Sequence, residues 1–130
     1  MLSHVTVGTN DFVRALGFYN PIMQALGRPV RREDASVPWK IWTSDDGQRP
    51  FFSLMGPFNG QPHEKGNGQM VALLAKSRDQ VDDIHAIALA NGGVCEGPPG
   101  LRTQYHENYY GAYFRDLDGN KLCVVYHGAN

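Results

Sequence analysis

The stretch LSHVTVGTND, residues 2–11, and its counterpart GQMVALLAKS, residues 68–77, decide the fold of this chain. In both, apolar residues alternate with other residues, as in a strand with two unlike faces. Each strand leads to a side chain that can cap a helix, Asn10 or Asp11 in the first copy and Ser77 in the second. The offset that places Asp11 on Ser77 also places Gly27 on Gly93, so the pattern indicates a duplication.

Length, charge and cysteine content limit the class of protein. With 130 residues, 42% of them hydrophobic, the chain suits one compact unit or two small halves that share a core. Its net charge of −1 argues against a nucleic-acid surface, and we interpret the basic pair Arg31-Arg32 as a solvated strand end. The sequence shows neither an apolar run of about 20 residues nor a signal-peptide pattern. Two cysteines make no disulfide framework. We therefore expect a cytoplasmic protein without nucleic-acid or membrane partners.

The first half is expected to hold one helix and three strands. Apolar residues at helical spacing predict a helix over residues 11–26, which Gly27 ends. Pro21 interrupts this helix, but the residue four positions earlier is Gly17, so we predict a kink instead of a break. Strands are predicted over residues 28–34, 39–43 and 50–55, with turn chemistry at residues 45–48.

The second half repeats this order after a segment rich in Gly, Pro and Asn, residues 57–68, which we interpret as a linker or a lid. The predicted elements are a strand over residues 69–75, a helix over residues 78–91, a short strand near Val94, and two strands that flank a turn at residues 116–120. The second copy is longer than the first, and we place its extra residues in a loop over residues 97–110.

Three stretches of the chain carry a resemblance to a known family: LSHVTVGTND, GNGQMVALLA at residues 66–75 and YYGAYFRDLDGNKLCVVYH at residues 109–127. The chain resembles the vicinal oxygen chelate superfamily, which includes glyoxalase I, bleomycin-resistance proteins and extradiol dioxygenases. The resemblance implies an α+β fold of two βαβββ modules, whose curved mixed sheet surrounds a shared cavity, commonly in a homodimer. We expect a single domain with module 1 over about residues 1–56 and module 2 over about residues 69–130.

Metal-using members of this family draw their ligands from four strand positions, and the resemblance places these on His4, Phe51, Met70 and Cys123. A divalent centre that chelates substrate oxygens needs His and carboxylate ligands, and only His4 has that chemistry. We therefore expect no cofactor, with a divalent metal at His4 as the alternative. A soft ion such as Cu(I) could use the imidazole, thioether and thiolate of His4, Met70 and Cys123, although Met and free Cys are also good core residues.

Strand alternation predicts which side chains face the cavity. If His4 faces inward, alternation along the strands turns a second set of side chains toward the helices. This helix-facing set is Val5, Val7, Val71, Leu73, Leu122 and Val124. The inward set is mainly apolar with a few polar groups, as in many small-molecule pockets. The alternative is that these side chains fill the cavity completely. The predicted inward residues are Thr6, Phe51, Ser53, Met55, Met70, Ala72, Leu74, Cys123 and Val125.

The loop RTQYHENYY, residues 102–110, is the second candidate for function. His106 could act as a general acid or base, because its ordinary pKa lies near neutrality. The alternative is that the tyrosines anchor the loop and His106 is a surface residue. We expect His127 to share the face of Cys123, and His63 and His85 to lie on the surface or on a helix face. The ligand-binding candidates in this loop are Arg102, Tyr105, His106, Tyr109 and Tyr110.

Taken together, these patterns predict a metal-independent protein that binds a small molecule in an apolar cavity. The alternative is an enzyme, a glyoxalase-like lyase or a dioxygenase, that uses a divalent metal. If the protein is an enzyme, His4 and His106 are the best catalytic candidates.

Overall fold

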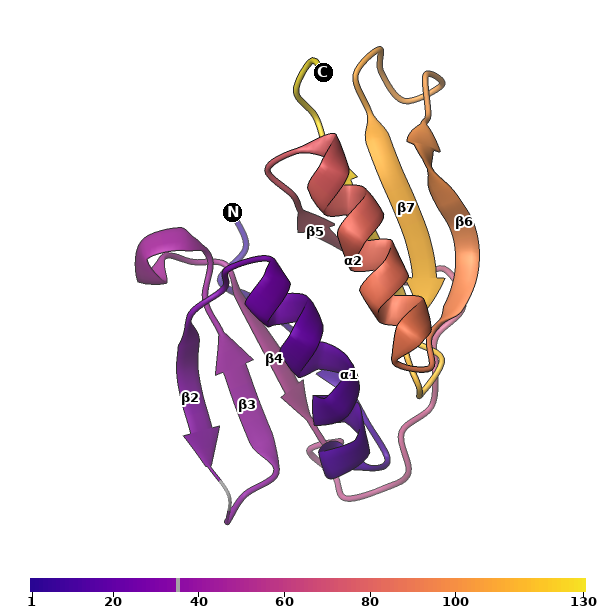
Figure 1. Cartoon of the computed structure of the whole chain (residues 1–130). Coiled ribbons are helices and arrows are strands. Elements are labelled where there is room, and N and C mark those ends of the chain that lie inside the picture. Colours follow the sequence, from indigo (N-terminus) through magenta and orange to yellow (C-terminus); the bar gives the residue numbers. More distant parts are fainter. Residues whose placement is uncertain (35) are drawn as a thin grey trace. The chain divides into compact units, whose positions relative to one another are not determined.

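The computed structural model describes residues 1–34 and 36–130. The chain forms two compact units, residues 1–65 and 66–130 (Figure 1). Each unit contains a strand, a helix and then three strands, with its helix packed on one face of a four-stranded sheet. This order confirms the predicted α+β fold of two βαβββ modules.

In unit 1 the first strand lies beside the last, so the sheet order is β1-β4-β3-β2. The β1 and β4 strands are parallel, and the other neighbours are antiparallel. The register pairs His4 with Phe51 and Thr6 with Ser53, so these four side chains share one face of the sheet. The elements of unit 1 are β1 (His4–Gly8), α1 (Phe12–Ala25), β2 (Val30–Asp34), β3 (Trp39–Trp42), the 3₁₀ turn Asp45–Gly47 and β4 (Phe51–Met55).

The helix of unit 1 follows from its sequence signals. The Asp11 carboxylate caps it by accepting from the backbone N–H of Arg14. The helix continues through Pro21 and ends at Ala25, followed by Gly27 at a φ of 71°. Its buried face supplies the core of unit 1, where the rings of Tyr19 and Phe52 lie 5.4 Å apart.

Unit 2 repeats this architecture with the order β5-β8-β7-β6. Ser77 caps its helix by accepting from the Gln80 N–H. The core beneath the helix contains Ile84, Phe114 and Leu122, all fully buried. The elements are β5 (Val71–Leu74), α2 (Arg78–Ala90), β6 (Val94–Leu101), β7 (Tyr110–Arg115) and β8 (Lys121–Tyr126).

The β6 strand differs from the sequence prediction, which placed a short strand near Val94 and a loop from residue 97. The strand extends to Leu101, through two prolines. Two register shifts, between Cys95 and Gly97 and between Gly97 and Gly100, let this segment pair with β7. Bulges of this kind accommodate residues that cannot donate to a regular ladder, so GPPG is part of a strand here.

His85 lies on a helix face, one of the two positions expected for it, and this face is buried, so the residue is only 8% exposed. It lies on the inner face of α2, where its Nε2 is 3.2 Å from the Cys95 Sγ and its ring is 6.5 Å from that of Phe114. Burial lowers the pKa of His85, while nearby Asp82 raises it to a smaller extent.

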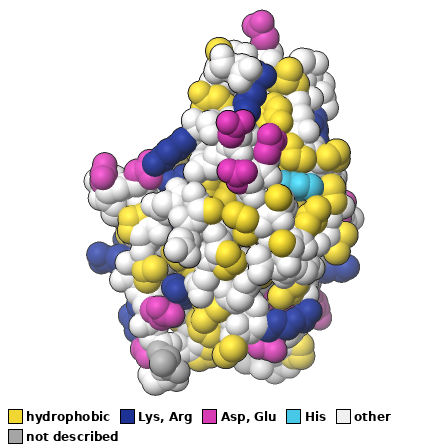
Figure 2. Space-filling model, in the orientation of Figure 1, with side chains coloured by type: hydrophobic (Ala, Val, Ile, Leu, Met, Phe, Trp, Pro, Cys, Tyr) yellow, Lys and Arg dark blue, Asp and Glu magenta, His cyan; other side chains and the backbone are white. Residues whose placement is uncertain are grey.

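The outer face of α2 is acidic. Asp79, Asp82 and Asp83 are exposed along it, and Figure 2 shows acidic side chains gathered over this helix. Within the described residues, no helix is long and apolar enough to cross a membrane.

Candidate ligand-binding site

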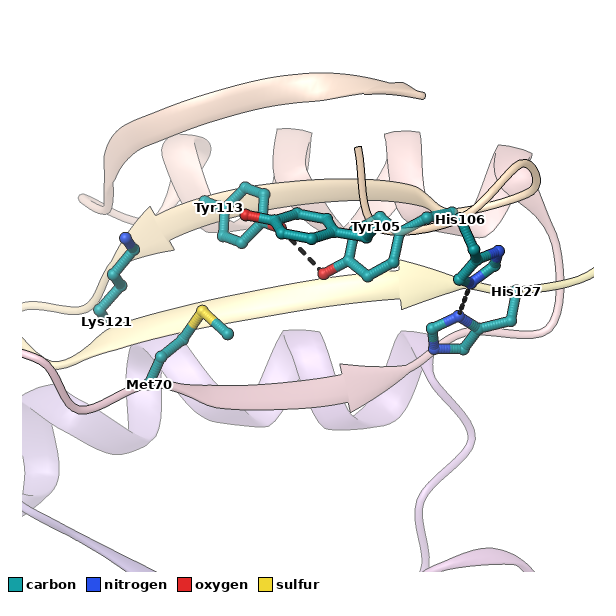
Figure 3. A pocket seen from close by; sticks show the side chains of 7 residues that line it. Met70, Tyr105, His106, Tyr113, Lys121 and His127 are labelled. Carbon is teal, nitrogen blue, oxygen red and sulfur yellow. Dashed lines mark hydrogen bonds between the residues drawn. The ribbon is translucent and has the colours of Figure 1, made fainter. Parts of the chain in front are cut away.

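An open cavity of about 440 Å³ lies on unit 2. Alternation along β7 and β8 turns Phe114 and Leu122 toward α2, and it turns Tyr113 and Lys121 to the opposite face of the sheet. The 102–109 loop and the residue after β8 complete the walls. The lining residues are Met70, Tyr105, His106, Tyr109, Tyr113, Lys121 and His127 (Figure 3).

Three polar groups form a network at the base of this cavity. The hydroxyls of Tyr109 and Tyr113 are 2.8 Å apart, and the Tyr109 hydroxyl is 3.5 Å from the Cys123 Sγ. Cys123 is fully buried. Burial raises the pKa of Cys123 and of both tyrosines. At neutral pH the cavity therefore offers neutral hydroxyl groups above a neutral thiol.

Two histidines form a second pair, in which His106 Nε2 and His127 Nδ1 are 2.8 Å apart. The Asn108 N–H donates to His106 Nδ1 at 3.2 Å, so the neutral His106 carries its proton on Nε2 and donates to His127. Both rings also contact the Tyr109 ring, at 5.6 and 5.4 Å between centroids. Both nitrogens of His106 are thus engaged, and the Nε2–H of His127 is the outer donor of the pair.

The cavity has two chemically different ends. Figure 3 shows Met70 and Lys121 at one end, His106 and His127 at the other, and the tyrosine rings between them. The Lys121 ammonium is 5.6 Å from the centre of the Tyr113 ring. A flat molecule with acceptor groups at its ends fits this arrangement, because rings offer apolar surface and the two ends offer donors.

Several predicted residues of unit 2 meet at this cavity, namely Met70, Tyr105, His106 and Tyr109, with His127 beside them. Cys123 lies beneath Tyr109. The other two loop candidates lie elsewhere. Tyr110 donates to Asp82 of α2 at 2.7 Å, a contact that also raises the pKa of Tyr110. Arg102 donates to the Pro98 carbonyl at 2.7 Å, with its guanidinium 5.5 Å from the Tyr113 ring centre.

The predicted residues of unit 1 share the sheet face that lies opposite α1. His4 and Thr6 are exposed there, and the His4 Nδ1 is 2.9 Å from the Ser3 hydroxyl. The buried Ser53 hydroxyl accepts from Trp39 Nε1 at 2.8 Å. The half-buried side chains of Phe51 and Met55 complete this set. That these residues meet those of unit 2, including the set His4, Met70 and Cys123, stays a prediction.

Tyr113 and Lys121 also line the cavity, although neither was among the residues predicted from the sequence. The signal for Lys121 was its position two residues before Cys123 on the same strand. Tyr113 lies directly opposite Cys123 in the β7–β8 register, which depends on the exact alignment of two strands across a turn. Alternation within one strand could have found the lysine, but not the tyrosine.

Of the side chains at the four family positions, only that of His4 is a ligand that a divalent ion prefers. Phe51 has no donor atom, and the guanidinium carbons of Arg31 and Arg49 lie 5.7 and 4.1 Å from the centre of its ring. The Cys123 thiol is buried and its pKa is raised, which opposes formation of the thiolate that metals bind. Among the residues that the structure describes, no three His, Cys, Asp or Glu side chains gather as a metal site.

Residues 1–124 match the Glyoxalase/Bleomycin resistance protein/Dioxygenase superfamily, and the chain belongs to this superfamily. A crystal structure of a glyoxalase/bleomycin resistance protein from Albidiferax ferrireducens T118 is similar along nearly its whole length. It is 39% identical, with a TM-score of 0.84, and the match covers 97% of this chain and 98% of that one.

Two more distant structures share the fold. A glyoxalase-related enzyme from Fulvimarina pelagi is 16% identical, with a TM-score of 0.70 over 97% of this chain and 87% of that one. A glyoxalase/bleomycin resistance protein/dioxygenase family enzyme from Burkholderia phytofirmans PsJN is 17% identical, with a TM-score of 0.69. The match covers 97% of this chain and 98% of that one. Proteins with curated functional descriptions yield no match to this sequence.

Proposed function

We propose that this protein binds a small, flat organic molecule in the cavity of unit 2, and that it does so without a metal ion. The observation that carries the proposal is the combination of tyrosine rings with donors at both ends of one open cavity. The neutral Tyr109 and Tyr113 hydroxyls can exchange hydrogen bonds with a ligand, and Lys121 can pair with an acidic group.

The polar groups at the two ends favour a ligand with two hydrogen-bonding positions. His127 Nε2–H donates at one end and the Lys121 ammonium at the other, while the Tyr105 and Tyr113 rings supply apolar contact. A ring system that carries a carbonyl, phenol or carboxylate at each end satisfies these groups. The ligand preference therefore follows from the cavity's own donors.

The test is a screen of flat aromatic phenols, ketones and carboxylic acids against the full chain. Binding is followed by thermal shift and by the NMR signals of the tyrosine rings. We expect a hit to raise the melting temperature by mass action and to shift the Tyr105 and Tyr113 signals. The Tyr113→Ala variant should weaken such a hit about tenfold, since it loses a ring contact and a hydroxyl together.

The matched control is Tyr110→Phe, a change on the same strand at a side chain that meets α2 instead of the cavity. This variant should bind the same hit within about twofold, because it alters no lining residue. Equal weakening by both variants, or hits that shift neither tyrosine signal, would contradict binding in the cavity.

The alternative is a metal-dependent lyase or dioxygenase, as the names of some relatives suggest. Protein purified without added metal should then contain a stoichiometric divalent ion, and His4→Ala should abolish its retention. Our proposal instead expects no bound ion and the same melting temperature with and without a chelator. The family positions support this expectation because only His4 offers a ligand that divalent ions prefer.

A further inference from the structure

The sheet of unit 1 carries a group of arginines on the face opposite α1. The guanidinium carbons of Arg49 and Arg31 lie 4.1 and 5.7 Å from the centre of the Phe51 ring. On the same face, the guanidinium of Arg32 lies 4.4 Å from the ring of Trp39. All three arginines are exposed, so solvent and solutes reach them.

The positive charge on this face exceeds the negative charge that meets it. Arg32 faces Asp34 at 3.6 Å, and Asp34 stays ionised because hydrogen bonds from Ser36 lower its pKa. Glu33 lies 3.4 Å from Lys40, on the other face of the sheet. Within the described part of the chain, neither Arg31 nor Arg49 forms an ion pair. Among the residues that the structure describes, two guanidinium charges therefore have no carboxylate counterpart.

Each of these guanidinium groups lies within cation–π distance of a ring, a contact that uses none of its N–H donors. A guanidinium that lies over a ring is attracted through its flat face, and its N–H groups point outward at its edge. Arg49 uses Nη1 to donate to the Ser3 hydroxyl at 3.0 Å and to the Ser3 carbonyl at 3.4 Å, and among the described residues its other guanidinium nitrogens have no hydrogen-bond acceptor. Donors fixed in this way bind a carboxylate or phosphate with little loss of side-chain freedom.

We propose that this face of unit 1 is an anion site that binds the carboxylate or phosphate of a small molecule through Arg31 and Arg49. The guanidiniums of both arginines contact the same ring, that of Phe51. His4 lies opposite Phe51 in the register and is exposed, so its imidazole can add a further donor. All the residues of this anion site belong to unit 1, whereas the proposed ligand cavity lies on unit 2.

The test uses phenyl phosphate and benzoate as probes, with benzyl alcohol as the neutral control. Titration of the full chain is followed through the NMR signals of the arginine Nε–Hε groups. We expect saturable shifts of the Arg31 and Arg49 signals with an acid, and none with the alcohol. Binding should weaken as salt rises, because the site is exposed. Tighter binding of one acid identifies the group that the site prefers, and either order supports the proposal.

Three variants separate a specific site from general attraction. Arg31→Gln and Arg49→Gln should each weaken binding about tenfold, the usual effect of losing a charge-assisted hydrogen bond. Arg49→Lys keeps the charge but loses the planar fork, and it should also bind more weakly than the native chain. The matched control is Arg14→Gln, which removes an exposed charge from α1 of the same unit and should change binding less than twofold.

Three results would overturn the proposal. They are equal weakening by Arg14→Gln, the same signal shifts with benzyl alcohol, and shifts that rise linearly without saturation. Melting temperatures of the variants identify any loss of fold, and Arg→Gln changes at exposed positions should leave them within a few degrees of the native value.

Discussion

The two cysteines of unit 2 differ in accessibility and in neighbours. Cys123 is fully buried beneath the Tyr109 hydroxyl, and its pKa is raised. Cys95 is exposed on β6, and its Sγ lies 3.2 Å from the His85 Nε2. Access and thiolate formation together control the reactivity of a thiol. The structure thus predicts an accessible, reactive thiol at Cys95 and a protected one at Cys123.

We expect iodoacetamide at neutral pH to label Cys95 and to leave Cys123 unlabelled in the folded protein. Mass spectrometry of peptides after a short pulse measures both sites. The Cys95→Ser variant should take up no label until it is unfolded in urea. Labelling of Cys123 at the rate of Cys95 would mean that the base of the cavity is open to solvent.

A second prediction concerns alkaline pH. Burial raises the pKa of Cys123, Tyr109 and Tyr113 in the folded state, whereas the unfolded chain loses the same protons near pH 8.5 and 10. Their contribution to stability is therefore complete below about pH 8.5 and decreases as the pH rises above it. Urea unfolding between pH 7.5 and 11 should show this decline. The decline should be shallower in the Tyr109→Phe variant, which lacks one of the three titrating groups. An equal slope in the variant would contradict a contribution of Tyr109 to the decline.

At the scale of the elements, glycines show how local sequence and tertiary contact combine. Gly8 ends β1, and a methyl group there would collide with the imidazole of His63. The segment that contains His63 is fixed to unit 1 by Asn10, whose side chain accepts from the His63 N–H at 2.7 Å and donates to its carbonyl at 3.2 Å. Gly17, in contrast, lies inside α1, and no side chain of the described residues comes within 4 Å of a methyl group added there.

Gly8→Ala and Gly17→Ala should consequently act in opposite directions. We expect Gly8→Ala to reduce the free energy of unfolding by about 1–3 kcal/mol through overpacking. Gly17→Ala should increase it by about 0.5–1 kcal/mol, because alanine loses less backbone entropy in a helix. Chemical denaturation of both variants measures these changes. A stabilising Gly8→Ala would show that His63 moves aside at no cost.

The element order followed from local signals. Alternation, the caps at Asp11 and Ser77, and the glycine after each helix all act over a few residues, so they can be read without the fold. The β6 strand could not be predicted in this way. Its GPPG segment has the local signature of a loop, and only pairing with β7 through two register shifts makes it a strand.

At the scale of the whole molecule, the small size of each half bears on oligomeric state. A half of about 65 residues buries little apolar surface by itself, so halves gain stability by pairing within a chain or between chains. We propose a homodimer, as the resemblance implied. Native mass spectrometry should show twice the chain mass of 14.4 kDa, without a bound metal ion. A monomer at micromolar concentration would contradict the dimer, and a stoichiometric ion would contradict metal independence.

The sequence by itself determined the duplicated βαβββ order, because periodicity, caps and turn glycines are local properties. It also predicted that Met70, Tyr105, His106 and Tyr109 serve binding, and these four line one cavity. Only the tertiary structure decided that Tyr113 stands opposite Cys123 and that His106 meets His127. Strand register and loop closure create such contacts between residues far apart in the chain, and no local pattern specifies them.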